Sequence, residues 1–154
     1  MTKLNQQLND FNSYLQQAGL DAKPHQREAV QWALEREGDP NPPNGVHGGL
    51  LADEMGLGKT IVMMGLIVSN FLQRTLVVLP LALLDQWASE IERTMGHRPL
   101  VFHGQGKKNI SDTELKAAPI VLTTYGHVSM KTPNEEGTRL HKLTWNRVIF
   151  DEAH

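Results

Sequence analysis

Apolar residues in the N-terminal part of the chain recur at the spacing of an α-helix. A first helix is predicted to end at Gly19, a residue type suited to a helix C-terminus, and it carries apolar side chains on one side: Leu4, Leu8, Phe11 and Leu15. A second helix is predicted from Pro24, whose fixed φ suits a first helical turn, to Gly38. We expect residues 20–154 to form a main lobe. The first helix, residues 1–19, either covers part of the core, which we favour, or forms an interaction surface.

After a proline-rich loop at 39–48, short apolar runs alternate with helical stretches. Strands are predicted at 49–52, 75–79, 100–102, 120–123 and 147–150. Helices are predicted between them at 59–72, 82–95 and 111–118. The strands are continuously apolar rather than alternating, which is typical of a parallel sheet with helices on both faces. The pattern therefore predicts an α/β fold.

Composition narrows the possible classes of protein. With 154 residues, 40% of them hydrophobic, the chain can form one domain with a sizeable core. It contains no cysteine, which excludes disulfides, and its seven histidines include no i, i+4 pair suited to a metal. The net charge of −2 gives no chain-wide basic signature of nucleic-acid binding, although a local basic groove is compatible with it. Because the longest apolar runs are too short to span a bilayer and the N-terminus has no signal-peptide core, we expect neither a membrane protein nor a secreted one.

A glycine-containing motif lies between the strand predicted at 49–52 and the next helix: Asp53, Glu54, Met55, Gly56, Leu57, Gly58, Lys59 and Thr60. Gly56 and Gly58 have no Cβ, so the backbone can turn its N–H groups inward on an anion. Lys59 supplies a positive charge for the outer phosphates of a nucleotide, and the Thr60 hydroxyl can hold Mg²⁺. The helix expected to begin at Lys59 adds its positive N-terminal end. The generic phosphate-binding motif has glycine where this chain has Asp53, so the match is incomplete.

An acidic motif, Asp151-Glu152-Ala153-His154, follows the strand predicted at 147–150. A carboxylate at the C-terminal end of a parallel strand is suited to hold Mg²⁺, and we assign this role to Asp151. Glu152 is the candidate to orient and deprotonate the water that attacks the outermost phosphate. Glycine-rich turns and Asp-Glu pairs each occur without such roles. The two motifs in this order, each after an apolar strand, nevertheless indicate a site for ATP and Mg²⁺.

The two motifs, together with residues 23–26, 76–80 and 121–125, resemble a known family. They are similar to the first RecA-like lobe of SWI/SNF-type ATPases, which are DNA-dependent translocases of helicase superfamily two. The similarity runs from about residue 20 to His154, the end of the family's DEAH box. Asp53, which departs from the generic motif, matches the usual form of this family. The resemblance implies a RecA-like, P-loop ATP-binding lobe with a mainly parallel sheet, preceded by two N-terminal helices.

The resemblance also implies roles outside the two motifs. Gln26, which follows Lys23, Pro24 and His25, looks like the family's adenine-reading glutamine. Its amide both donates and accepts hydrogen bonds, so it can pair with the adenine edge. Without these neighbours, Gln26 would be interpreted as a helix-surface residue. Other residues correspond to loops that lie along one DNA strand in the family: Pro80, Gln86, Thr123, Thr124 and Tyr125. Hydroxyl and amide groups at strand ends suit phosphate contacts, but ordinary strand-to-helix turns explain the same residues equally well.

Family members carry a second RecA-like lobe whose arginines reach the outer phosphate, and such arginines accelerate phosphoryl transfer on the order of a thousandfold. We therefore expect this chain to be the N-terminal part of a longer ATPase that moves on duplex DNA in remodelling or repair, and to hydrolyse ATP poorly alone. By family analogy the protein would be nuclear in a eukaryote and cytoplasmic otherwise. Two alternatives stay open: a stand-alone, non-catalytic ATP-binding or interaction module, and, with less support, a fragment of a DEAH-type RNA helicase.

Overall fold

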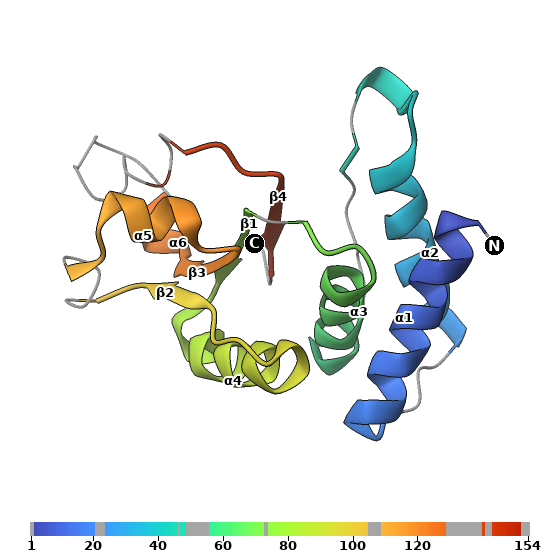
Figure 1. Ribbon diagram of the computed structural model, residues 1–154, viewed down its shortest axis with the longest axis horizontal. Coiled ribbons are helices and arrows are strands. Elements are labelled where there is room, and N and C mark those ends of the chain that lie inside the picture. Colours follow the sequence, from blue (N-terminus) through green and yellow to red (C-terminus); the bar gives the residue numbers. More distant parts are fainter. Residues whose placement is uncertain are drawn as a thin grey trace. The chain divides into compact units, whose positions relative to one another are not determined.

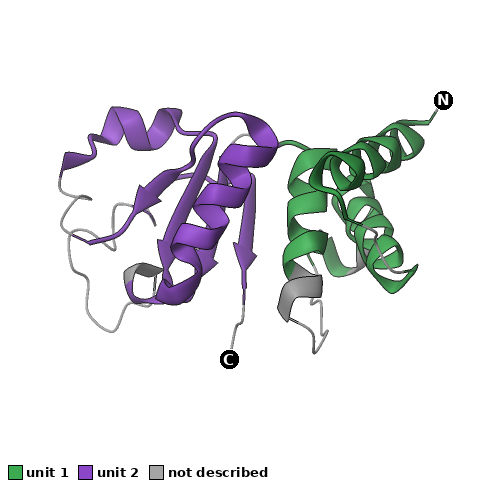
Figure 2. Ribbon diagram, turned by 90° about the horizontal axis from the view of Figure 1, so that it is seen from below, with its two compact units in different colours: residues 1–71 green, residues 72–154 purple. Residues whose placement is uncertain are grey.

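The computed structural model of the chain describes residues 2–20, 24–45, 47–48, 56–72, 74–104, 109–128, 140 and 143–151 (Figure 1). At residues 43, 56–59 and 127–128 the description covers the backbone only. The chain divides into two compact units, residues 1–71 and 72–154 (Figure 2). The division into 1–19 and 20–154 that the sequence suggests stays a prediction.

The first unit contains three helices and a short 3₁₀ turn: α1 (Lys3–Ala18), α2 (Pro24–Gly38), α3 (Gly56–Ser69) and the turn at Pro43–Gly45. Helix α1 begins where the Thr2 hydroxyl accepts a hydrogen bond from the Asn5 N–H, at 3.2 Å. It ends at Gly19, whose φ of 66° lies in the left-handed region that glycine adopts readily. Both N-terminal helices therefore end at the residues that the sequence predicts.

The three helices pack on one another. All three carry buried apolar side chains: Phe11, Tyr14, Leu15, Val30, Leu34, Val62, Met64 and Ile67. The Phe11 ring lies so close to the backbone of Gly65 that a Cβ at this position would overlap the ring. Glycine thus allows a close approach of α1 to α3. The expectation that the N-terminal helix covers part of a core is confirmed.

The second unit contains a sheet of four strands: β1 (Thr75–Leu79), β2 (Leu100–Phe102), β3 (Ile120–Thr124) and β4 (Arg147–Phe150). The strand order is β2-β3-β1-β4, and each neighbouring pair is parallel. Every residue of β1 and β3 is buried, as expected for apolar strands between two helical layers. The predicted α/β class and these four strands are confirmed, while the strand predicted at 49–52 lies outside the described residues.

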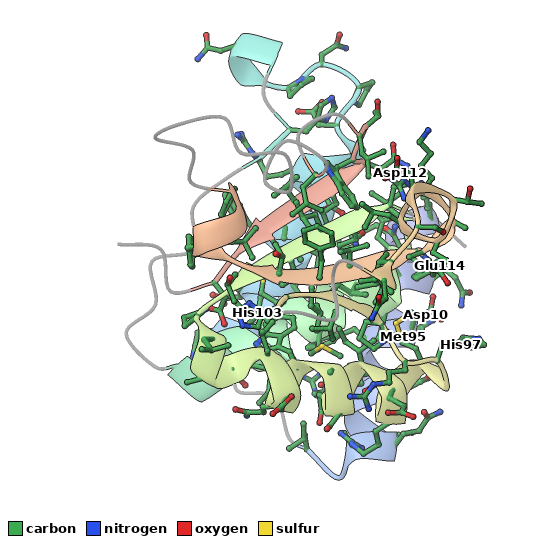
Figure 3. The ribbon with its side chains drawn as sticks, turned by 90° about the vertical axis from the view of Figure 1, so that its left-hand side faces the viewer. Asp10, Met95, His97, His103, Asp112 and Glu114 are labelled. Carbon is green, nitrogen blue, oxygen red and sulfur yellow. The ribbon has the colours of Figure 1, made fainter. Side chains whose placement is uncertain are left out.

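Helices cover both faces of this sheet. Helix α4 (Leu84–Met95) lies on one face, and α5 (Asp112–Ala117) lies on the other (Figures 1 and 3). Figure 3 marks these helices by labelled residues: Met95 at the end of α4, and Asp112 and Glu114 on α5. The predicted capping box of α5 is present, because Ser111 and Glu114 each accept a hydrogen bond from the other's backbone N–H, at 3.1 and 2.9 Å.

The strand register gathers a buried cluster under α5: Leu76, Val78, Phe102, Leu115, Val121 and Leu140. The same register places Val148 and Phe150 of β4 on this face, where they are 43% and 55% exposed. Arg147 and Ile149 of the same strand are buried. Strand β4 thus alternates between buried and exposed residues, unlike β1 and β3. It does so because it has a neighbour on one side only among the described strands.

The structure differs from the predicted elements at several boundaries. Helix α3 begins at Gly56 rather than Lys59, because the apolar periodicity used for the prediction starts only at Ile61 and glycine adopts helical φ and ψ freely. A 3₁₀ turn at Leu81–Leu83 precedes α4, and a short helix, α6 (Tyr125–Val128), follows β3 without a break. A helix long and apolar enough to cross a membrane does not occur in the described part of the chain.

Candidate functional site

The carboxyl ends of all four strands lie at one edge of the sheet, because the strands are parallel. The residues that follow the strands at this edge are Pro80 after β1, His103 after β2, Tyr125 after β3 and Asp151 after β4. Ligands of open parallel sheets bind at such an edge, so these residues form the candidate site of the second unit.

Asp151 is a buried acidic residue at this edge, with only 6% of its surface exposed. Its backbone N–H donates a hydrogen bond to the Val78 carbonyl (3.0 Å), which extends the ladder between β4 and β1 by one residue. The Tyr125 hydroxyl donates a hydrogen bond of 2.6 Å to the Asp151 carbonyl. The Tyr125 ring stacks on Phe150, with centroids 6.2 Å apart and an interplanar angle of 29°. The backbone of Asp151 is therefore held by two hydrogen bonds, one to β1 and one from the residue that follows β3.

The threonines at the end of β3 make contacts with β2. The hydroxyl of Thr123, which is fully buried, donates a hydrogen bond to the Phe102 carbonyl at 2.9 Å. The Thr124 hydroxyl lies 3.5 Å from the Nδ1 atom of His103, a residue labelled in Figure 3. These contacts fix the carboxyl ends of β2 and β3 relative to one another.

The other residues assigned to DNA contact lie around the same edge of the sheet. Pro80 is half-buried between β1 and the 3₁₀ turn, whereas Gln86 is exposed on α4. The neighbouring Trp87 is buried in the core. Tyr125 is half-buried, so Gln86 and Tyr125 present more surface than the two threonines. The assignment of these residues to DNA stays a prediction.

In the first unit, the predicted phosphate cradle coincides with the start of α3. The backbone of Gly56 to Lys59 forms the first turn of this helix, whose N–H groups have no partner within a helix. Such a turn suits an anion, because its N–H groups and the helix dipole both favour negative charge. Thr60 follows as a half-buried residue of the same helix.

Gln26 is the third residue of α2, and only 5% of its surface is exposed. The plain alternative for this residue, a glutamine on a helix surface, is therefore wrong. Helix α2 packs directly on α3, the helix that carries Lys59 and Thr60. Adenine recognition by the buried amide stays a prediction.

Several predicted site residues lie outside the described residues: Asp53, Glu54, Met55 and Glu152. Among the residues that are described, no three His, Asp or Glu side chains gather into a metal-binding group. The predicted Mg²⁺ site does not require such a group, because its protein ligands are one hydroxyl, from Thr60, and one carboxylate, from Asp151.

Two features of the second unit were not predicted from the sequence. The hydrogen bond from Tyr125 to Asp151 joins residues 26 positions apart, and no local pattern indicates such a pair. Arg74, at the opposite edge of the sheet, donates hydrogen bonds to the carbonyls of Leu115 (2.7 Å) and Lys116 (2.6 Å). Its guanidinium also lies 4.6 Å from the ring centre of Trp145.

Comparison with known proteins gives relatives that include ATP-dependent helicases. The chain is 34% identical over 154 aligned residues to "Uncharacterized ATP-dependent helicase C23E6.02" of Schizosaccharomyces pombe, covering 84% of this chain and 14% of that protein. It is 38% identical to the "Probable global transactivator" of Orgyia pseudotsugata multicapsid polyhedrosis virus, covering 84% of this chain and 26% of the relative. "ATP-dependent helicase rhp16" of S. pombe is 36% identical, over 88% of this chain and 17% of that protein. The chain thus spans about a quarter or less of the length of these relatives.

A solved structure agrees with the sequence relatives. The SWI2/SNF2 ATPase core of Sulfolobus solfataricus in complex with dsDNA matches with a TM-score of 0.63 and 28% sequence identity, over 84% of this chain and 25% of that chain. The RecA-like character of the α/β fold is therefore confirmed. The model of the family described as "SNF2-related domain" matches residues 25–154, which leaves α1 outside the match. The chain belongs to the SNF2-related domain family.

Proposed function

We propose that this chain is the ATP-binding lobe of a DNA-dependent ATPase that couples ATP hydrolysis to movement on duplex DNA. One observation carries the proposal: a buried aspartate ends a strand of a parallel sheet, within a chain that matches the SNF2-related domain over residues 25–154. Relatives named ATP-dependent helicases support the ATPase class, and the neighbour in complex with dsDNA supports the choice of duplex DNA.

The residues present fit a nucleotide with its metal. The first turn of α3 offers backbone N–H groups to phosphate oxygens, and Lys59 is a cation next to them in the sequence. The Thr60 hydroxyl and the Asp151 carboxylate are hard oxygen ligands of the kind that Mg²⁺ prefers. When bound, Mg²⁺ would neutralise charge on the outer phosphates. The Gln26 amide is the candidate to recognise adenine.

Glu152 is the proposed general base. It follows Asp151 directly in the sequence, so a group that fixes the peptide between the two residues also restricts the position of Glu152. Its role would be to orient a water and accept a proton from it as the water attacks the terminal phosphate.

Duplex DNA is the proposed activator. Gln86 and Tyr125 have exposed surface near the carboxyl edge of the sheet, where phosphate contacts would position the lobe without reading base sequence. We propose that the lobe acts within a longer protein that supplies arginines from a second lobe. In a eukaryote this protein would work in the nucleus.

The test is the ATPase activity of a protein that carries this chain together with a second lobe. We expect duplex DNA to stimulate turnover. Glu152→Gln should retain ATP affinity and lose turnover on the order of a hundredfold or more, because it removes the base without removing a phosphate contact. Glu92→Gln is the matched control, since Glu92 is an exposed residue of α4 whose ion pair with Arg98 (3.1 Å) contributes little.

Two results would contradict the proposal. If turnover does not respond to duplex DNA but rises with duplex RNA, the chain belongs to an RNA-dependent enzyme. If Glu152→Gln turns over ATP as fast as Glu92→Gln, Glu152 is not the base.

A further inference from the structure

Pro80 and Tyr125 together determine how the Asp151 carbonyl is hydrogen-bonded. In a parallel ladder, a residue that donates its N–H to one neighbour accepts a hydrogen bond from the residue two positions further along that neighbouring strand. The Asp151 N–H donates to the Val78 carbonyl, so the expected donor to the Asp151 carbonyl is the backbone nitrogen of residue 80. Residue 80 is proline, which has no N–H.

The Tyr125 hydroxyl takes the place of this missing donor. It lies 2.6 Å from the Asp151 oxygen, a short distance for a neutral donor. Its direction is fixed by two features: Tyr125 follows β3 without a break, and its ring stacks on Phe150. A tyrosine from the far side of β1 therefore completes the hydrogen bonding of β4 at the point where the ladder would otherwise end.

The hydrogen-bonded carbonyl belongs to the peptide group that links Asp151 to Glu152. Restraining this group limits rotation about ψ of Asp151, and thus the direction in which the chain leaves the sheet. We infer that Tyr125 is a positioning residue for ATP hydrolysis, which acts on the acidic motif through the Asp151 carbonyl. This inference rests on the proposed function, because it assigns Tyr125 to the same reaction as Asp151 and Glu152.

The arrangement also links the two ligands of the proposed activity. Tyr125 ends the segment proposed to lie along DNA, and its hydroxyl contacts the residue proposed to hold the metal. A DNA phosphate that moves this segment would therefore move the peptide group before Glu152. DNA stimulation of turnover should depend on the hydroxyl of Tyr125.

The experiment compares Tyr125→Phe with a matched control in the two-lobe protein. Tyr125→Phe keeps the ring and its stacking on Phe150 but removes the hydroxyl. The control is Trp145→Phe, which removes a similar hydrogen bond, from Nε1 to the Leu140 carbonyl (3.0 Å), in the same unit but away from Asp151. The kcat and KM for ATP are measured with and without duplex DNA, together with the affinity for a non-hydrolysable nucleotide.

We expect Tyr125→Phe to lower kcat about tenfold, because a misplacement of about 1 Å can cost about a hundredfold and the loss of one hydrogen bond should cause a smaller one. Nucleotide affinity should change by less than about twofold. The stimulation of kcat by duplex DNA should also fall in this variant. Trp145→Phe should keep kcat and DNA stimulation. Hydrogen exchange of the Glu152 amide should become faster in Tyr125→Phe and stay unchanged in Trp145→Phe.

A rescue variant tests the geometric basis of the inference. Adding Pro80→Ala to Tyr125→Phe restores an N–H at residue 80, whose φ of −59° and ψ of 145° another residue can adopt. The double variant should regain the kcat measured without DNA. Hydrogen exchange of its Glu152 amide should again be slow. A double variant as impaired as Tyr125→Phe would overturn the role of the hydroxyl as a substitute donor.

The remaining outcomes separate this inference from the proposed function. If Tyr125→Phe and Trp145→Phe have equal kcat and equal exchange at Glu152, Tyr125 is merely structural and the inference is overturned, while the proposed function stands. If the unsubstituted protein neither binds nor hydrolyses ATP, the proposed function fails first.

Discussion

Arg74 connects several segments at the amino end of the sheet. Its hydrogen bonds reach the last carbonyls of α5, which are otherwise without intrahelical donors, and its guanidinium contacts the Trp145 ring. The Arg74 carbonyl also accepts a hydrogen bond from the Asn146 N–H (2.9 Å), just before β4. A φ of 69°, unusual for a residue with a Cβ, accompanies these contacts.

Replacing Arg74 by alanine should destabilise the chain by about 2 kcal/mol, because two charge-assisted hydrogen bonds and a cation–π contact are lost together. The free energy of unfolding is measured by urea denaturation. Arg98→Ala is the control, since Arg98 pairs only with an exposed carboxylate and should cost less than about 1 kcal/mol. Equal effects of the two substitutions would show that the Arg74 contacts contribute no more than a surface ion pair.

Individual residues were predictable from the sequence where their role depends on neighbours along the chain. The Ser111 capping box and the glycine that ends α1 follow from local backbone chemistry and are present. The contacts of Arg74 and Tyr125 were not predictable, because each joins residues that are distant in sequence. Fixing them requires the strand order, which a single sequence does not determine.

The helices and strands themselves followed closely from apolar periodicity. Strand β1 has the predicted bounds, and β3 extends one residue beyond them. The prediction was least accurate where backbone chemistry rather than periodicity sets the boundary, at the glycines that open α3 and at the short helix α6. The alternating exposure of β4 also depends on its position in the strand order, which the sequence of the strand alone does not determine.

At the contact between α1 and α3, the effect of Gly65→Ala on stability should change sign with the presence of the Phe11 ring. Alanine normally stabilises a helix relative to glycine by about 1 kcal/mol. At Gly65 the added methyl group would overlap the buried Phe11 ring, and overpacking costs about 1–3 kcal/mol, so Gly65→Ala should destabilise the chain. In a Phe11→Ala background the ring is gone, and the same substitution should become stabilising.

Thermal unfolding of four proteins, the unsubstituted chain, Gly65→Ala, Phe11→Ala and the double variant, measures the coupling between the two positions. Gly38→Ala, at a helix position with no atom near the added Cβ, controls for the general effect of removing a glycine and should be neutral or stabilising. A cost of Gly65→Ala that is the same with and without the Phe11 ring would rule out the close contact. Because α1 lies outside the family match, this contact would be a feature that the family resemblance does not predict.

The residues of the proposed nucleotide site are distributed over both compact units. Gln26, Lys59 and Thr60 belong to residues 1–71, whereas Asp151 belongs to residues 72–154. The sequence indicated Lys59, Thr60 and Asp151 through the order and spacing of two motifs, and the family resemblance implied Gln26. The structure adds the local environments of Gln26, Thr60 and Asp151. The chain spans about a quarter or less of the length of the relatives that it matches, so ATP hydrolysis by the isolated chain is a separate question from nucleotide binding.

We propose that this chain binds ATP together with Mg²⁺ through the start of α3. Calorimetric titration of the chain with ATP, in the presence and absence of Mg²⁺, tests it most directly. We predict Mg²⁺-dependent binding that weakens by about 2 kcal/mol, or about thirtyfold in Kd, in Lys59→Ala, because a charge-assisted phosphate contact is lost. The control Lys3→Ala, at the exposed start of α1, should bind as tightly as the unsubstituted chain. Absent binding, or equal binding in Lys59→Ala and Lys3→Ala, would show that the start of α3 does not hold the nucleotide.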